Sequence, residues 1–177
     1  MATVAVHFLM LVCSISEGSM NLLFHLLIYY LLLSVLLYGS LAYNPRMWLH
    51  RMPPEVTAKI PPKTPSEKRL LIKTVAIPFL LLLVAYPTIH VLQQEANWLH
   101  YFLILCSFLA GFDIWDTLVL DLLIFCKLTP RFIIIAGTER QDYANMSYHL
   151  TSGVKGVLIA LVASGVLATI LFFIKLA

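Results

Sequence analysis

Four apolar runs, separated by short polar segments, constrain this chain more than any motif does. They cover approximately residues 21–43, 70–92, 98–126 and 153–174. A helix of about 20 apolar residues is long enough to cross a hydrocarbon core of roughly 30 Å. The composition agrees, because 60% of the residues are apolar, 12% are charged and the mean hydropathy is +0.89, outside the range of soluble domains. The sequence therefore predicts an all-α polytopic membrane protein, a four-helix transmembrane bundle.

The first 20 residues fit this scheme less well than the rest. They are apolar but too short to span, and they lack the basic start of a signal peptide. We expect either a short interfacial segment at residues 1–20 or a natural start at Met20, and a four-span domain at residues 21–177.

Lysine and arginine predict the orientation. Eleven of the 12 follow the first or third run or lie just inside the next one, and the "QQEAN" turn between the second and third runs has none. The positive-inside rule then places loops 44–70 and 127–150 in the cytoplasm and both termini outside. The basic residues are topology determinants on this interpretation, so the expected partner is the lipid bilayer and no nucleic acid is expected. A homo-oligomer or a larger membrane complex remains open.

Prolines affect the predicted structure of two segments. The paired prolines of segment 44–69 favour an extended loop over a packed domain. Pro78 and Pro87 lie inside the second run, where we expect a kink in the helix and no break.

Three aspartates interrupt the apolar stretch "GFDIWDTLVLDLLIFCK" of the third run. On a helix, Asp113, Asp116 and Asp121 share one small and polar face, which should turn away from lipid. A carboxylate at mid-membrane costs roughly 2.5 to 3.5 kcal/mol on insertion scales, so it should be paired inside the bundle. The candidate site adds cationic groups from the cytoplasmic ends of neighbouring spans, namely Arg46, His50, Arg131 and His149. Such pairs either hold the bundle together or form a functional polar pocket.

The same residues and the outer histidines include side chains that can bind a metal or a haem. Asp116, Asp121 and His149 are chemically suitable metal ligands, although their spacing gives no support. His25, His90 and His100 could meet near the outer surface, where two facing histidines can ligate a haem. Interfacial histidines without a cofactor are the simpler interpretation, and the sequence identifies neither a cofactor nor a catalytic residue. The cysteines, Cys13, Cys106 and Cys126, show no paired or metal-ligand spacing and are expected to be free thiols.

Small residues recur every four positions along the fourth run. Gly156, Ala160, Ser164 and Ala168 form this small-residue stripe, which allows another helix to approach closely. The neighbour is either a helix of the same chain or a second copy. Nearby, "IAGTERQDY" contains Gly137 and Thr138, for which we expect a turn or a helix cap, with an anion contact as the alternative.

Several motifs together resemble a group of small four-helix bacterial membrane proteins. These are "NPRMWLHRMPPEV" with "PPKTPSEKR", followed by "WDTLVLDLLIFC", "GTE" and His149, and they extend over nearly all of the chain after Asn21. The resemblance implies a location in the bacterial cytoplasmic membrane. It implies no particular activity.

Three functions are compatible with these residues. The first is the binding or transport of a cation, a proton or a lipid headgroup in an acidic pocket of the inner leaflet. The second is a membrane-embedded, metal-dependent enzyme that acts on a lipid. The third is an accessory subunit without chemistry of its own. The short loops contain few polar residues that could take part in catalysis, which favours a binding or accessory role.

Overall fold

The computed structural model describes residues 2–94 and 97–176, with side chains from Asn21 onward. Every regular element in these residues is helical. Four segments are long and apolar enough to cross a membrane: Asn21–Tyr43, Pro65–Leu92, Trp98–Leu128 and Arg140–Leu176. The predicted all-α, four-span architecture is therefore confirmed. The structure does not describe the side chains of residues 1–20, so the two predictions for this segment lie outside the described residues.

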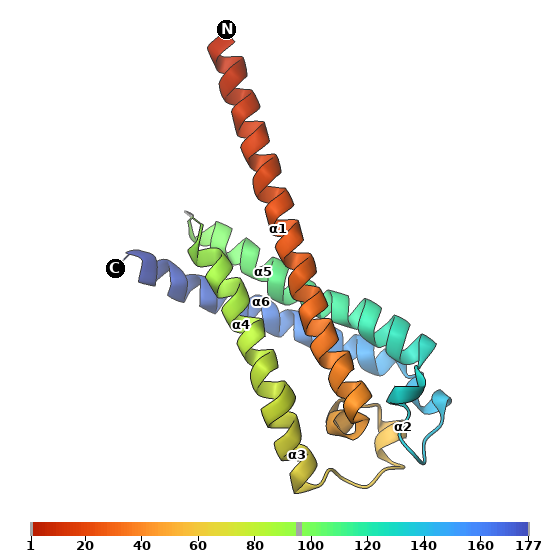
Figure 1. Cartoon of the computed structure of the whole chain (residues 1–177). Helices are drawn as coiled ribbons and strands as arrows, with labels where there is room; N and C mark the ends of the chain where they lie inside the picture. The colour runs from red at the N-terminus through yellow and green to blue at the C-terminus, as the bar shows by residue number, and fades with distance from the viewer. Residues whose placement is uncertain (1, 95–96, 177) are drawn as a thin grey trace.

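The connections gather at the two ends of the bundle (Figure 1). The segments after α1 and after η3 lie at one end, which we call the basic end, and the α4–α5 turn and the C-terminus lie at the other. The elements follow in the order α1 (Ala2–Tyr43), η1 (Pro45–Arg51), α2 (Pro54–Thr57), α3 (Pro65–Leu71), η2 (Ile72–Ala76), α4 (Ile77–Leu92), α5 (Trp98–Trp115), η3 (Asp116–Leu128), η4 (Arg131–Ile133), η5 (Arg140–Tyr143) and α6 (Met146–Leu176).

The second span is one helix built from α3, η2 and α4. It begins at a capping box, in which the Thr64 hydroxyl accepts from the Glu67 amide and the Glu67 carboxylate accepts from the Thr64 amide. The π-helical η2 ends just before Pro78, with the Ile77 amide bonded to the Ile72 carbonyl. A proline lacks the N–H and crowds the preceding turn, and a wider π turn accommodates it. The helix consequently continues through Pro78 and Pro87 without a break.

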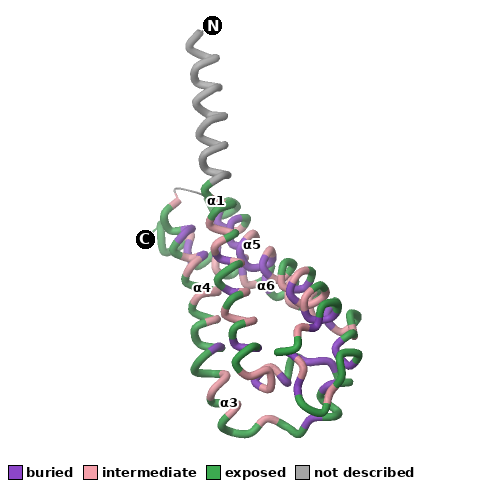
Figure 2. Tube along the Cα trace, turned by 45° about the vertical axis from the view of Figure 1, so that its right-hand side comes forward, coloured by how far each residue is buried: buried purple, intermediate pink, exposed green. Residues whose placement is uncertain are grey.

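The small-residue stripe packs within the chain, against α5. Ala160, Ser164 and Ala168 are buried, and Ala160 packs against Leu109 and Ala110 of α5. Buried residues lie along α5 and α6 where the two helices run together (Figure 2). Of the two neighbours that the sequence left open, the structure identifies a helix of the same chain.

The loop after α1 is packed, which corrects the prediction of an extended segment. Met52, Val56 and Ile60 bury their side chains against Ile133 and Ile135 of the second loop. The prolines do shape short helices, but the apolar residues between them supply a small core of their own. The two loops therefore form one packed cap at the basic end.

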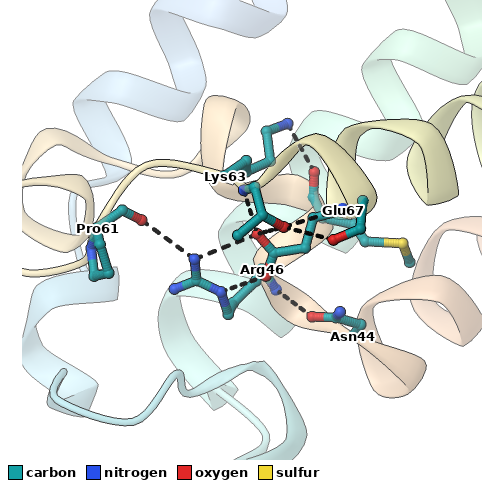
Figure 3. A network of polar contacts seen from close by, with 8 residues as sticks. Asn44, Arg46, Pro61, Lys63 and Glu67 are labelled. Carbon is teal, nitrogen blue, oxygen red and sulfur yellow. Dashed lines mark hydrogen bonds and ion pairs between the residues drawn. The ribbon is translucent and has the colours of Figure 1, made fainter.

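Polar contacts fix this cap to the helices. Figure 3 shows the Arg46 side chain reaching Glu67, with Nε 2.6 Å from Oε1, and donating from Nη2 to the Pro61 carbonyl. Between the loops, Lys59 Nζ lies 2.7 and 2.8 Å from the two carboxylate oxygens of Asp142. The Arg46 contacts hold η1 close to the start of α3, and the Lys59 contact joins the two loops.

Candidate functional site

One pocket of about 660 Å³ lies between the helices in the half of the bundle next to the cap. Its walls come from α1, η1, the α3–η2–α4 helix, α5 with η3, and α6. The charged and polar groups in the wall include Tyr38, His50, Arg51, Asp113, Asp116, Asp121, Tyr148, His149 and Ser152. All three predicted aspartates thus reach the same pocket.

Asp113 and Asp116 lie one helical turn apart on the α5–η3 side of the pocket. α6 approaches Asp113 through Gly156, where an added Cβ would lie only 2.9 Å from the Asp113 carboxylate oxygen Oδ1. A larger residue at position 156 would therefore displace this carboxylate. Within the described residues, neither Asp113 nor Asp116 forms a hydrogen bond or an ion pair with another side chain.

Asp121 pairs with His149, whose Nδ1 lies 2.9 Å from Asp121 Oδ2. The register of η3 explains how Asp121 reaches the pocket. Because η3 is π-helical from Asp116 to Leu128, its backbone hydrogen bonds join residues five apart, and Asp121 follows Asp116 by about one π turn. An α-helix continued through this segment would have turned Asp121 further from Asp116.

His149 is the most deeply buried polar residue of the pocket wall, at 4% exposure. The Phe125 ring lies beside it, with 5.0 Å between ring centroids. Since Nδ1 contacts the Asp121 carboxylate, we assign a ring hydrogen to Nδ1, which donates to that carboxylate. Nε2 is buried without a hydrogen-bond partner among the described residues.

The cationic side of the pocket comes from η1. Asn44 caps this 3-10 helix, and its three-residue turn places Trp48 and Arg51 in the pocket wall together with His50. Lys63 Nζ lies 2.8 Å from His50 Nδ1. Partial burial of the ring, followed by the charges of Lys63 and Arg51, lowers the pKa of His50. His50 is consequently a neutral ring that accepts at Nδ1 and carries its hydrogen on Nε2.

Two of the predicted cations lie elsewhere, and one was missed. Arg46 pairs with Glu67, outside the pocket wall, and Arg131 does not line the pocket. Arg51 is the arginine that does line it. The signal in the sequence is the three-residue spacing of Trp48 and Arg51 after the Asn-Pro cap, which indicates one face of a 3-10 turn.

The remaining pocket wall is apolar and reaches the outer surface of the bundle. Leu80 of α4 and Ile159 of α6 line the pocket and are nevertheless 59% and 69% exposed. Further along α6, the wall continues to Ala163, roughly 21 Å from His149 at 1.5 Å per residue. The pocket therefore has an apolar arm that opens sideways and a polar end next to the cap.

The metal set considered from the sequence is not assembled. Asp121 and His149 are paired, but no group of three or more His, Cys, Asp or Glu side chains in the described part of the chain is placed to hold a metal ion. This arrangement gives no support to Asp116, Asp121 and His149 as a ligand set. Cys106 and Cys126 are free thiols, as expected.

The outer histidines contact one another directly. The rings of His25 and His90 lie 4.6 Å apart between centroids, and His25 Nδ1 is 2.8 Å from the Tyr86 hydroxyl. A haem needs its macrocycle between two axial ligands, and these rings in direct contact leave no space for one. His100 is exposed at the start of α5 and lines neither described pocket.

The "GTE" segment forms a turn. Gly137 has φ +92°, and the Thr138 hydroxyl lies 2.7 Å from the Ile135 carbonyl and 2.8 Å from the Tyr143 hydroxyl. Glu139 begins η5 with a capping box to Asp142. The turn that was expected here is present, and the Thr138 hydroxyl is used within it.

Comparisons with known proteins add no further constraint. No family model, curated protein or solved structure matches the chain. The resemblance to small four-helix bacterial membrane proteins therefore stays a prediction.

Proposed function

We propose that this protein binds a membrane lipid in the pocket, with the headgroup at the polar end and a hydrocarbon chain along the apolar arm. One observation carries the proposal: a single pocket joins a sideways apolar opening at Leu80 and Ile159 to the charged groups around Asp116 and Arg51. A lipid has the same order of chemistry along its length. Entry from the side would not require the chain to leave the hydrocarbon layer.

The dimensions favour a lipid over a bare cation or proton. A volume of about 660 Å³ lies in the range of pockets for organic ligands, roughly 300 to 1,000 Å³. An ion would need only the polar end and would leave the apolar arm without a role. A metal-dependent lipid enzyme is less well supported, because the described carboxylates and histidines form no three-ligand group.

We further propose that the basic end of the bundle lies in the cytoplasm of a bacterial cell. Eleven of the 12 lysines and arginines belong to the cap, the loops or the adjoining helix ends, as the positive-inside rule requires of a cytoplasmic face. On this orientation the polar end of the pocket lies at the level of the inner-leaflet headgroups, and the bound lipid comes from that leaflet.

Obstruction of the apolar arm tests the proposal. Ala76 is exposed and lines the pocket, whereas Ala85 is exposed on the same helix outside it. We expect the Ala76→Phe protein to lose the phospholipid that the parent retains in mild detergent, as counted by native mass spectrometry. The Ala85→Phe protein should retain it. Equal lipid retention by parent and a folded Ala76→Phe protein would refute lipid binding in this pocket.

A further inference from the structure

We infer that the pocket selects a lipid whose headgroup carries a primary ammonium together with a phosphate, the chemistry of a phosphatidylethanolamine. This inference rests on the proposed lipid binding and adds the class of headgroup. It follows from which pocket groups accept hydrogen bonds, which donate them, and which lack a partner within the described residues.

The α5–η3–α6 side of the pocket presents acceptors. Ionised carboxylates only accept hydrogen bonds, and those of Asp113 and Asp116 have no side-chain partner among the described residues. Both side chains are half-buried. A carboxylate that is partly withdrawn from water without a partner is unfavourable, so a ligand that donates several hydrogen bonds should be favoured here. A primary ammonium has three N–H donors and the opposite charge.

His149 adds a polar group beside these carboxylates. Its Nδ1 is held by Asp121, and its buried Nε2 has no partner in the described structure. In the neutral ring with its hydrogen on Nδ1, Nε2 accepts a hydrogen bond. Protein atoms enclose Nε2, so a ligand ammonium would reach it only after the side chains around it shift, and a phosphate would not satisfy it.

The η1 side presents donors. Arg51 lines the pocket and forms no ion pair with a described carboxylate. The Lys63 ammonium donates to His50 Nδ1, so the hydrogen of His50 is on Nε2. A guanidinium matches a phosphate by paired N–H donors, and the His50 N–H adds a third.

Opposite charges thus line one pocket without pairing with each other. Among the described residues, neither Asp113 nor Asp116 forms an ion pair with a cation, and the exposed Arg51 forms none with a carboxylate. A zwitterionic headgroup placed between them supplies both missing partners at once. A phosphatidylcholine carries the same two charges but no N–H on its quaternary nitrogen, and a phosphatidylglycerol has no cation.

The experiment compares these three headgroups on identical acyl chains in nanodiscs, with bound lipid measured by native mass spectrometry. We expect phosphatidylethanolamine to bind about tenfold or more tightly than the other two, because each lacks charge-assisted N–H donors. Asp116→Asn should remove most of this preference. Arg51→Gln should weaken all three lipids, since all three carry a phosphate. Glu55→Gln, outside the pocket wall, should change nothing.

The outcomes separate this inference from the proposed function. Equal binding of the three lipids by the parent, with binding still lost in Ala76→Phe, would overturn the headgroup assignment and leave lipid binding in place. An Asp116→Asn protein that is folded and keeps the parent's preference would also overturn it. If the parent binds none of the lipids, both proposals fall. Size-exclusion chromatography and circular dichroism establish that each variant is folded.

Discussion

Gly153 of α6 packs directly on Thr117 of η3, so closely that a Cβ added at Gly153 would lie 2.7 Å from Thr117 Cγ2. Real carbon atoms do not approach this closely, so the two helices owe their separation here to the missing side chain. The same close approach places Asp113 beside α6 at the wall of the pocket.

The first prediction compares two glycine variants. We expect Gly153→Ala to destabilise the protein by about 1 to 3 kcal/mol, because overpacking forces α6 away from η3. Gly39 is the matched control, since an added Cβ there meets nothing within 4 Å. Gly39→Ala should be neutral or stabilising by up to about 1 kcal/mol, because alanine favours helix. Thermal unfolding in one detergent measures both, and equal stability of the two variants would show that the close packing is absent.

The second prediction concerns the contact between the two loops of the cap. The Asp142 carboxylate accepts from Lys59 Nζ and from the Glu139 amide, and it is buried. We expect Asp142→Ala to destabilise the protein more than Glu55→Ala does, because it removes hydrogen bonds to a charged group and leaves the Glu139 amide without its acceptor. Glu55→Ala removes only the exposed bond to Asn145 and should cost less than about 1 kcal/mol. Chemical denaturation distinguishes them, and similar losses would contradict the assigned role of Asp142.

The spans and the stripe could be predicted because they depend on hydrophobicity and side-chain size alone. About 20 apolar residues make a span wherever they occur, and Ala160 and Ser164 permit close packing in any register. The sequence could not say which helix they would meet. That depends on how α5 and α6 are joined, through a cap whose packing involves residues far apart in the chain, such as Val56 and Ile133.

The pocket was harder to predict, for two physical reasons. The face of Asp121 was calculated with α-helical geometry, whereas η3 is π-helical and carries Asp121 to His149. The choice between Arg46 and Arg51 depends on the 3-10 turn of η1 and on Glu67, which holds Arg46 outside the pocket wall. The π-helical stretch has no strong sequence pattern, and the spacing that indicates the 3-10 turn does not show that Glu67 pairs with Arg46.

The third prediction concerns pH. Burial, followed by the charges of Lys63 and Arg51, lowers the pKa of His50 from its ordinary value of 6.5. Near and below pH 6.5 the unfolded chain binds a proton at His50 more readily than the folded protein does. The free energy of unfolding therefore decreases as the pH falls through this range. Between about pH 7.5 and about pH 5.5, the melting temperature should therefore fall more in the parent than in His50→Gln.

A histidine at the other end of the bundle supplies the control for this measurement. His100 is exposed at the start of α5. His100→Gln should keep the parent's dependence of melting temperature on pH. An unchanged dependence in His50→Gln would mean that the ring protonates as easily in the folded protein as in the unfolded chain.

The last prediction tests the orientation that places the pocket in the inner leaflet. Ala58 follows α2 in the cap and Gln93 follows α4, and both are exposed. α2 and the end of α4 lie at opposite ends of the bundle (Figure 1). In a background without the native cysteines, an impermeant thiol reagent should label Gln93→Cys in intact cells and Ala58→Cys only after permeabilisation. The positive-inside rule gives the reason, because all the lysines and arginines except Lys175 lie toward the cap end. Lys175, at the other end, donates to the Gln94 carbonyl. Labelling of Ala58→Cys in intact cells would reverse the orientation and move the pocket to the outer leaflet.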